Sequence, residues 1–308
     1  MHGKRCLFIL KLTFFAATQL YSQNNAVKFH HQIDLSHLYT TDAAFFNALS
    51  VSTENKYYLV DVGQNRILHT DSLAQLLNEV GGFGWELEQF DWPVDIWAEN
   101  SLDVFVADYN NSRVQRFDRH LNFVTAIIGE KVENESKQFA FPVAVAWSSF
   151  GDLFIIESEL NRIIQFDELG VATLSFGDYG EGAGQLEAPA ALCVSGKNEI
   201  FVVDQGRISV LKYDYYGNFL QEFAFHSLSK PVAISSHHGL IFVLDGMENR
   251  IIVAAENGKE LFRFSPIPVE NRKKKPQLTD LCTQKNRLYI LDNTRRRIDV
   301  YTVVMDDK

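Results

Sequence analysis

The sequence predicts an all-β protein folded as a six-bladed β-propeller, and three observations lead to this prediction. One pattern recurs six times: an apolar strand ending in an acid, a short polar turn, an arginine, and a second apolar strand. The six acids lie 41 to 49 residues apart. The chain is also rich in strand-forming aromatics, with 24 Phe and 11 Tyr, and has only 7 Pro. The copies read "YYLVDVGQNRILHTD" (57–71), "VFVADYNNSRVQRFD" (104–118), "LFIIESELNRIIQFD" (153–167), "IFVVDQGRISVLKYD" (200–214), "IFVLDGMENRIIVAA" (241–255) and "LYILDNTRRRIDVYT" (288–302).

Each copy is flanked by two further apolar segments, which complete a blade. An upstream segment usually begins with proline, as in "PVDIWA" (93–98) and "PVAVAW" (142–147), and a downstream segment follows, as in "FVTAIIG" (123–129). Four short strands in about 45 residues are the period of a propeller blade. Helical repeats are excluded because no segment after residue 23 holds a long 3.6-residue periodicity. We expect at most a brief helical turn in "DSLAQLLNEVG" (71–81).

The two ends of the repeat series predict how the ring closes. The sixth copy has three strands and lacks an outer one, whereas "VKFHHQIDL" (27–35) is a strand without a blade. Pairing this strand with the last blade would close the ring and protect an exposed sheet edge. We therefore expect four-stranded antiparallel blades, with the N-terminal strand closing the last one. His30 and His31 are adjacent on that strand, so we expect them to face opposite sides.

The motif "VADYNNSRVQRFD" (106–118) and the linker "FGDYGEGAGQLEAP" (176–189) resemble those of NHL-repeat six-bladed β-propellers. The resemblance covers about residues 42–308, with a short turn at 204–207 and Leu278 in place of the leading proline. It implies a propeller in which the glycine-rich linker joins two blades. The linker leads into a strand, whereas a phosphate-binding loop leads into a helix N-terminus, so we interpret it as a connector. Some relatives in this family are lyases that bind metal through channel histidines, and some intracellular ones bind RNA.

The first 23 residues have the three-part pattern of a secretory signal: a basic start, an apolar run and a polar end. We expect residues 1–23 to be removed and 24–308 to form one propeller domain in the periplasm or outside the cell, without a transmembrane span. A net charge of −10 argues against nucleic acid as a partner. The remaining cysteines, Cys193 and Cys282, do not form a disulfide framework, and we expect a monomer.

The acid and the arginine of each copy have two interpretations. Six carboxylates around a ring would suit cations, whereas an acid at the end of a strand also pairs with a nearby arginine and accepts hydrogen bonds from the turn. We favour the structural interpretation, because a catalytic site seldom needs six copies. The predicted pairs are Asp61–Arg66, Asp108–Arg113, Glu157–Arg162, Asp204–Arg207, Asp245–Arg250 and Asp292–Arg297.

Enzyme activity is a weaker hypothesis than binding. Asp95 and Asp280 take equivalent positions on the innermost strands, and together they could hold Ca²⁺ or Zn²⁺ for a lyase or hydrolase at the channel. We favour the alternative that these aspartates line a solvated channel or form a hydrogen bond with the adjacent blade. No histidine lies on the innermost strands 93–98, 142–147, 189–194, 231–236 or 278–283, and no catalytic residue can be assigned. We expect no cofactor.

The favoured hypothesis is a non-enzymatic binding or scaffold module that presents loops on one face to a protein or a polyanion. Two basic clusters and several aromatic residues lie in connections that emerge on the same face of a propeller. The candidate contacts are Lys273, Lys274, Lys275, Arg295 and Arg296, with Trp85, Trp92, Tyr109 and Tyr179.

Overall fold

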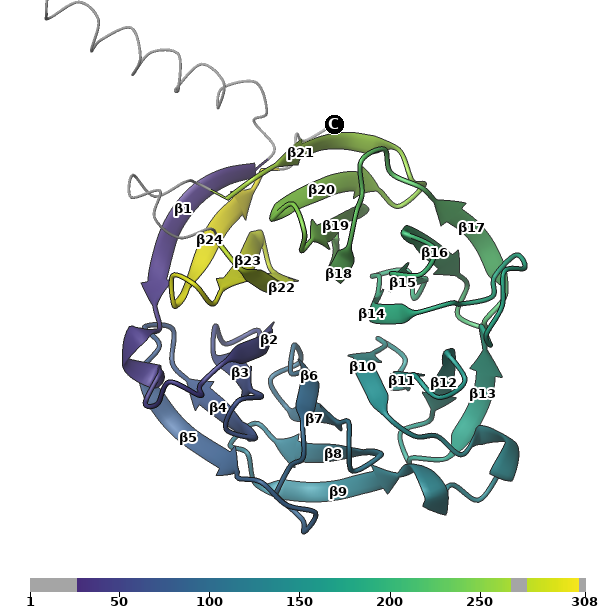
Figure 1. The fold of residues 1–308 in the computed structure, drawn as a ribbon, viewed down its shortest axis with the longest axis horizontal. Coiled ribbons are helices and arrows are strands. Elements are labelled where there is room, and N and C mark those ends of the chain that lie inside the picture. The colour runs from purple at the N-terminus through teal and green to yellow at the C-terminus, as the bar shows by residue number, and fades with distance from the viewer. Residues whose placement is uncertain (1–26, 267–275, 305–308) are drawn as a thin grey trace, which may run out of the picture.

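Six four-stranded antiparallel sheets form a ring around a central channel in the computed structural model (Figure 1). The structure describes residues 27–266 and 276–304. Blades 1 to 5 each contain four consecutive strands, and the sixth contains three strands and the N-terminal one. The predicted six-bladed β-propeller is confirmed.

The strands of the first three blades are as follows. Blade 1 contains β2 (Phe46–Val51), β3 (Tyr57–Asp61), β4 (Arg66–Thr70) and β5 (Leu76–Gly81). Blade 2 contains β6 (Pro93–Trp97), β7 (Asp103–Asp108), β8 (Arg113–Asp118) and β9 (Phe123–Ile128). Blade 3 contains β10 (Pro142–Trp147), β11 (Leu153–Glu157), β12 (Arg162–Phe166) and β13 (Ala172–Phe176).

The second half of the ring follows the same order. Blade 4 contains β14 (Pro189–Val194), β15 (Ile200–Asp204), β16 (Ser209–Tyr213) and β17 (Phe219–Phe223). Blade 5 contains β18 (Pro231–His237), β19 (Leu240–Asp245), β20 (Arg250–Ala255) and β21 (Glu260–Phe264). Blade 6 contains β22 (Leu278–Gln284), β23 (Arg287–Asp292), β24 (Arg297–Val303) and β1 (Val27–Asp34). Short 3₁₀ turns lie at η1 (Ser36–Leu38), η2 (Gly129–Lys131) and η3 (Glu135–Lys137).

The ring closes as the two ends of the sequence predict. β1 pairs antiparallel with β24, from Val27 opposite Val303 to Asp34 opposite Arg297. The N-terminal strand thus becomes the outer strand of blade 6. This pairing joins the first and last described parts of the chain, so no blade lacks a strand.

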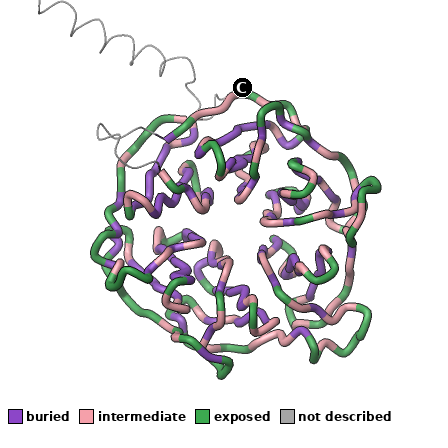
Figure 2. The backbone as a smooth tube through the Cα atoms, in the orientation of Figure 1, coloured by how far each residue is buried: buried purple, intermediate pink, exposed green. Residues whose placement is uncertain are grey.

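The core lies between neighbouring blades, because the second strand of each blade packs on both faces. All five residues of β3, β11 and β15 are buried, whereas most residues of the outer strands are half-buried or exposed (Figure 2). One cluster joins Phe154 and Ile156 of blade 3 with Ile200 and Val202 of blade 4. Such continuous apolar strands are expected where sheets are covered on both sides. Among the described residues, no helix is long and apolar enough to cross a membrane.

Two local expectations are wrong. Residues 76–81 form the outer strand β5 and not a helical turn, because pairing with β4 dominates over the local helical pattern of this stretch. The histidine rings of His30 and His31 do not face opposite sides, since their centroids lie 4.7 Å apart. A β-bulge between Phe29 and His31 shifts the register there and turns the two rings towards each other.

Candidate functional site: the top face

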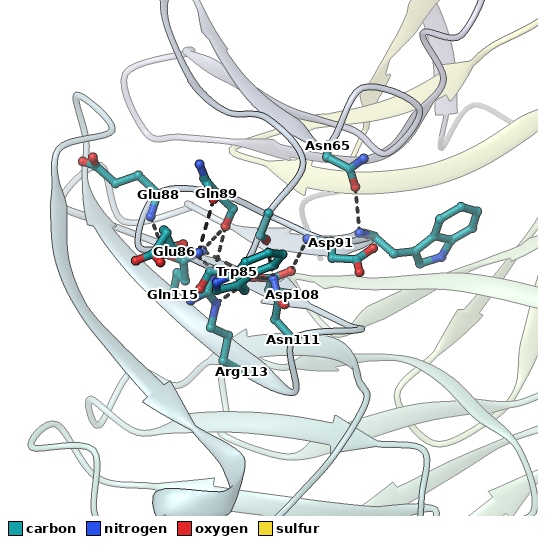
Figure 3. A network of polar contacts seen from close by, with 12 residues as sticks. Asn65, Trp85, Glu86, Glu88, Gln89, Asp91, Asp108, Asn111, Arg113 and Gln115 are labelled. Atoms are coloured by element: carbon teal, nitrogen blue, oxygen red, sulfur yellow. Dashed lines mark hydrogen bonds and ion pairs between the residues drawn. The ribbon is translucent and has the colours of Figure 1, made fainter.

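The loops that connect successive blades emerge on one end of the ring, together with the turns between second and third strands. We call this end the top face and the opposite end the bottom face. In blade 2, the acid–arginine pair fastens one of these loops (Figure 3). Arg113 Nε donates to Asp108 at 2.7 Å, and its other nitrogens donate to the carbonyl oxygens of Trp85, Glu86 and Gln89, each at 2.8 Å.

Three other repeat arginines fasten the chain in the same way. Arg162 pairs with Glu157 and donates to the carbonyls of Ser136 and Gln138 in the loop before blade 3. The pairs Asp61–Arg66 and Asp245–Arg250 are also ion pairs, and their arginines donate to the carbonyls of Leu38 and Ser227. The arginine therefore holds a top-face connection, and the acid orients the arginine.

The expected pairs of blades 4 and 6 are wrong. Arg207 pairs with Glu222 at 2.8 Å, because the short turn leaves Asp204 to accept backbone N–H groups instead. Arg297 pairs with Asp299 on its own strand at 2.8 Å. The partner of Asp292 is Arg295, at 3.3 Å.

The loop 82–92 presents an apolar surface at the top of blades 1 and 2. Phe83, Trp85, Leu87 and Trp92 are 68%, 73%, 54% and 54% exposed. Trp92 has a φ of +61°, a backbone conformation that bulky residues rarely adopt, and its N–H donates to Asn65. Backbone strain of this kind is concentrated at functional sites.

The remaining aromatic candidates lie on the same face. Tyr179 is exposed in the loop 177–188. Tyr109 is half-buried, with its ring centroid 5.2 Å from that of Phe141. Phe141 directly precedes Pro142, as Trp92 precedes Pro93, and it also has a positive φ, of +53°. Sequence reasoning missed Phe83, Leu87 and Phe141, although their position in the same connections as Trp85 and Trp92 could have identified them.

The glycine-rich linker before blade 4 is a connector like the loop 82–92. Tyr179 bridges to Leu186 as Phe83 bridges to Phe90, so the two loops have the same fold. Gly184 has a φ of +75°, and a Cβ there would lie 2.6 Å from the Cβ of Phe219. This glycine is required by backbone conformation and close packing, as expected for a joint between blades.

Of the five basic candidates, the structure describes only Arg295 and Arg296. Lys273, Lys274 and Lys275 lie outside the described residues. Arg295 pairs with Asp292, and the Arg296 guanidinium lies 4.7 Å from the ring centroid of Tyr39. Both arginines therefore have partners within the propeller.

The described connections before blades 2, 3 and 4 are acidic. Glu86, Glu88, Glu130, Glu133 and Glu135 are exposed, and none of them forms an ion pair with any residue that the structure describes. The other acids of these three loops are Asp91, Asp178, Glu181 and Glu187, and the lysines are Lys131 and Lys137. Sequence reasoning missed this charge, because a clustered run of lysines is easier to notice than acids spread over three loops.

The channel carboxylates link neighbouring blades. Asp95 Oδ2 accepts from Val145 N–H of blade 3 at 2.8 Å, and Asp280 Oδ2 accepts from Leu49 N–H of blade 1 at 2.7 Å. Both aspartates directly follow a register shift, so the bulge positions them to reach the next blade. This is the structural alternative that the sequence left open.

The pKa values of these two aspartates and of the nearby Glu99 are raised. Burial raises the pKa of Asp95 to about 7, and it raises the pKa of Glu99 to about 7. Burial, and then the charge of Asp95, raise the pKa of Asp280. Glu99 was not among the sequence candidates, because it lies in the turn after β6 and not on an innermost strand.

Known proteins resemble this chain in sequence and in fold. No family model matches the chain. It is 33% identical to "Protein brain tumor" of Drosophila melanogaster over 146 residues, which are 46% of this chain and 13% of that protein. It is 32% identical to "B-box type zinc finger protein ncl-1" of Caenorhabditis elegans over 145 residues, 47% of this chain and 16% of that protein. It is also 26% identical to "Probable peptidyl-alpha-hydroxyglycine alpha-amidating lyase pgal-1" of the same nematode over 131 residues, 41% of this chain and 37% of that protein.

Its homologues are NHL-repeat proteins. The match spans well under half the length of each of these relatives. Among solved structures, streptogramin B lyase matches with a TM-score of 0.61 and 13% identity, over 90% of this chain and 98% of that one. The nidogen/laminin complex matches with a TM-score of 0.57 and 14% identity, over 73% of this chain and 81% of that one. These structures share the fold of the six-bladed propeller described here.

The channel aspartates of this propeller already bond to the neighbouring blades. No group of three or more His, Cys, Asp or Glu side chains suited to a metal lies within residues 27–266 and 276–304. Asp95 and Asp280 each use a carboxylate oxygen on a backbone N–H of the next blade. His237 ends β18 with its ring 4.1 Å from that of His238, so the two rings contact each other. Cys193 and Cys282 are free thiols whose pKa values burial raises.

Proposed function

We propose that this chain is an exported, monomeric, non-enzymatic binding module whose top face holds a protein segment with apolar and basic side chains. The observation that carries the proposal is the exposure of Phe83, Trp85, Leu87 and Trp92 on one fastened loop. Large exposed apolar patches on soluble proteins mark interaction sites. Trp and Tyr are also enriched among the residues that dominate binding energy at interfaces.

The loop is well ordered before any partner arrives. Arg113 holds three of its carbonyls, and Gln115 donates to the carbonyl of Gln89 and accepts from Glu88 N–H (Figure 3). A loop that is already fixed loses little conformational entropy on binding, so more of the contact energy appears as affinity. The four-stranded blades supply the rigid frame.

The charge of the top face favours a basic partner over a polyanion. Nine carboxylates against two lysines lie in the connections 82–92, 129–141 and 177–188. Acidic and basic surfaces attract before contact, which raises the association rate. An exposed tryptophan beside these acids also suits the side chain of a lysine or an arginine, since the face of its ring attracts cations. A polyanion would be repelled by the same surface.

The proposal of export rests on residues 1–23, whose pattern is that of a secretory signal.

The test compares two double variants that remove exposed aromatics from opposite faces. Trp85→Ser with Trp92→Ser removes the top-face aromatics, and Phe150→Ser with Tyr216→Ser removes two exposed rings of the bottom face. Tagged proteins are used for affinity purification from the envelope of the exporting cell. A partner should be retained by the wild type and the bottom-face variant and lost by the top-face variant. Retention by the top-face variant would refute the proposal.

A lyase or hydrolase acting at the channel is the second candidate. It is favoured by the raised pKa values of Asp95 and Glu99 and by the similarity to a probable amidating lyase. It ranks second because Asp95 and Asp280 are engaged by backbone N–H groups. Among the described innermost strands, only β18 contains a histidine, and this residue, His237, ends the strand and contacts His238.

A further inference from the structure

A cavity lies on the bottom face between blades 1 and 2, away from the top-face loops. It has a volume of about 560 Å³, within the range of small-molecule sites. Its walls come from three bottom-face turns and from the strands β3, β4 and β5. The lining residues are Ser52, Glu54, Lys56, Tyr58, His69, Leu77, Asn78, Ser101, Arg119 and His120.

His69 in this cavity has two buried nitrogens without a partner. The side chain is 5% exposed, and neither Nδ1 nor Nε2 makes a hydrogen bond to any described residue. Its ring stacks on that of Tyr58, with the ring centroids 4.5 Å apart and an interplanar angle of 1°. The Tyr58 hydroxyl donates to the carbonyl of Arg119 and not to the His69 ring. Buried polar groups without partners are rare and costly, so each one requires an explanation. Stacking explains the position of the ring but not its unused nitrogens.

The charged groups around His69 are Lys56, Arg119, Glu54 and Asp118, and the Asp118 carboxylate accepts hydrogen bonds from the His120 and Asn122 N–H groups. Arg119 pairs with Glu54 at 3.3 Å, and both side chains are about half exposed. Lys56 is half-buried and forms no ion pair with the part of the chain that the structure describes. Arg119 Nε donates to His120 Nε2, so the proton of a neutral His120 lies on Nδ1, which can donate. The cavity thus combines an ammonium group that is outside any described ion pair with several N–H donors.

We propose that this cavity binds the carboxylate of a small ligand, with Lys56 and Arg119 holding the carboxylate and His69 bonding a neighbouring polar group. A monoanion matches the single ammonium group that no described ion pair uses, whereas a phosphate dianion would leave one negative charge unpaired in a partly buried site. Charge-assisted hydrogen bonds of this kind are the strong ones in proteins.

The state of His69 defines the rest of the ligand. Burial, followed by the charges of His120 and Lys56, lowers the pKa of His69 to about 4, against the opposing effects of Asp118 and Glu54. The ring is therefore neutral near pH 7, with one nitrogen that donates and one that accepts. An amide or a hydroxyl next to the carboxylate satisfies both. The ligand reaches the ring by displacing wall side chains, and Leu77 and Lys56 are exposed enough to change rotamer.

The test uses three defined probes: N-acetyl-dialanine, its C-terminal amide, and glycolate. Binding is followed through the ¹⁵N chemical shifts of the His69 ring, with inorganic phosphate as a fourth titrant. Both carboxylates should shift the two ring nitrogens in a saturable way, and the amide should not. Tighter binding of the peptide would identify a chain terminus as the source, and tighter binding of glycolate would identify a free hydroxy acid.

Three variants complete the test. Lys56→Met should weaken binding by roughly tenfold or more, as expected for a lost charged hydrogen bond. Lys259→Met removes an exposed lysine of blade 5 and should leave binding unchanged. His69→Phe keeps a ring to stack on Tyr58, so it should fold normally and lose binding, as judged by calorimetry. Equal binding of the amide, preference for phosphate, or no saturable shift in the folded wild type would each overturn the proposal.

Discussion

The fastening of the 82–92 loop by Arg113 gives a quantitative prediction. Arg113→Met keeps most of the aliphatic stem but removes a guanidinium that is almost fully buried. Asp108 then keeps donors from Asp91 N–H and from the Asn111 amide, but loses its ion pair. Removing one partner of a buried pair costs about 3–5 kcal/mol. The two remaining donors place the expected loss in the free energy of unfolding near the lower end, about 3 kcal/mol.

Urea denaturation measures this loss, and hydrogen exchange of the 82–92 amides measures the loosening of the loop. The matched control is Arg119→Met, whose exposed pair with Glu54 is expected to contribute about 0–1 kcal/mol. Asp108→Asn combined with Arg113→Met should be less destabilising than Arg113→Met alone, because the double variant leaves no unpaired buried charge at position 108. Equal losses for Arg113→Met and Arg119→Met, with unchanged exchange in the loop, would refute the role assigned to the pair.

Three further predictions follow from the same structure. The pKa values of Asp95 and Glu99 are raised to about 7 in the folded protein, so their stabilising effect is complete below the unfolded pKa of about 4 and is lost as pH rises to about 7. Asp95→Asn with Glu99→Gln should therefore flatten the fall in unfolding free energy between about pH 4 and about pH 7. An unchanged slope would contradict these pKa values. Reversing the charges of Lys273, Lys274 and Lys275 should leave partner capture intact, because the acidic top-face loops attract the basic partner. Loss of capture would instead support the basic contact surface that the sequence predicts. Elemental analysis of the purified protein should find no stoichiometric Ca²⁺ or Zn²⁺, since the channel carboxylates bond to backbone N–H groups; a metal that is lost in Asp95→Asn with Asp280→Asn would support the enzyme.

The ring was predictable from the sequence, because each blade is one copy of a structural repeat and the same residue pattern recurs in each copy. The unpaired strand at 27–35 and the three-stranded last copy were enough to predict the closure through β1 and β24. Bulges were not predictable. The bulge at His30 brings the rings of His30 and His31 into contact. The bulge before Asp95 directs its carboxylate to the next blade.

The pairing of charges was predictable in blades 1, 2, 3 and 5. In blade 6, Arg297 also lies opposite Asp292, but it pairs with Asp299 on its own strand. In blade 2 the arginine lies opposite the acid, so Asp108 and Arg113 are cross-strand neighbours. In blade 4 the shortened turn places Arg207 near Glu222 instead. The unpaired nitrogens of His69 could not be found from sequence, because they depend on which side chains of blades 1 and 2 fail to reach the ring.

Site-specific photo-crosslinking tests the central claim, that the top face is the binding surface. A benzoylphenylalanine placed at Trp92 or at Tyr179 on the top face, or at Phe150 on the bottom face, is irradiated in the exporting cell. All three side chains are exposed, so they sample solvent comparably before a partner binds. The account predicts crosslinks to one protein with a basic segment from Trp92 and Tyr179, and none from Phe150. Crosslinks only from Phe150 would contradict it.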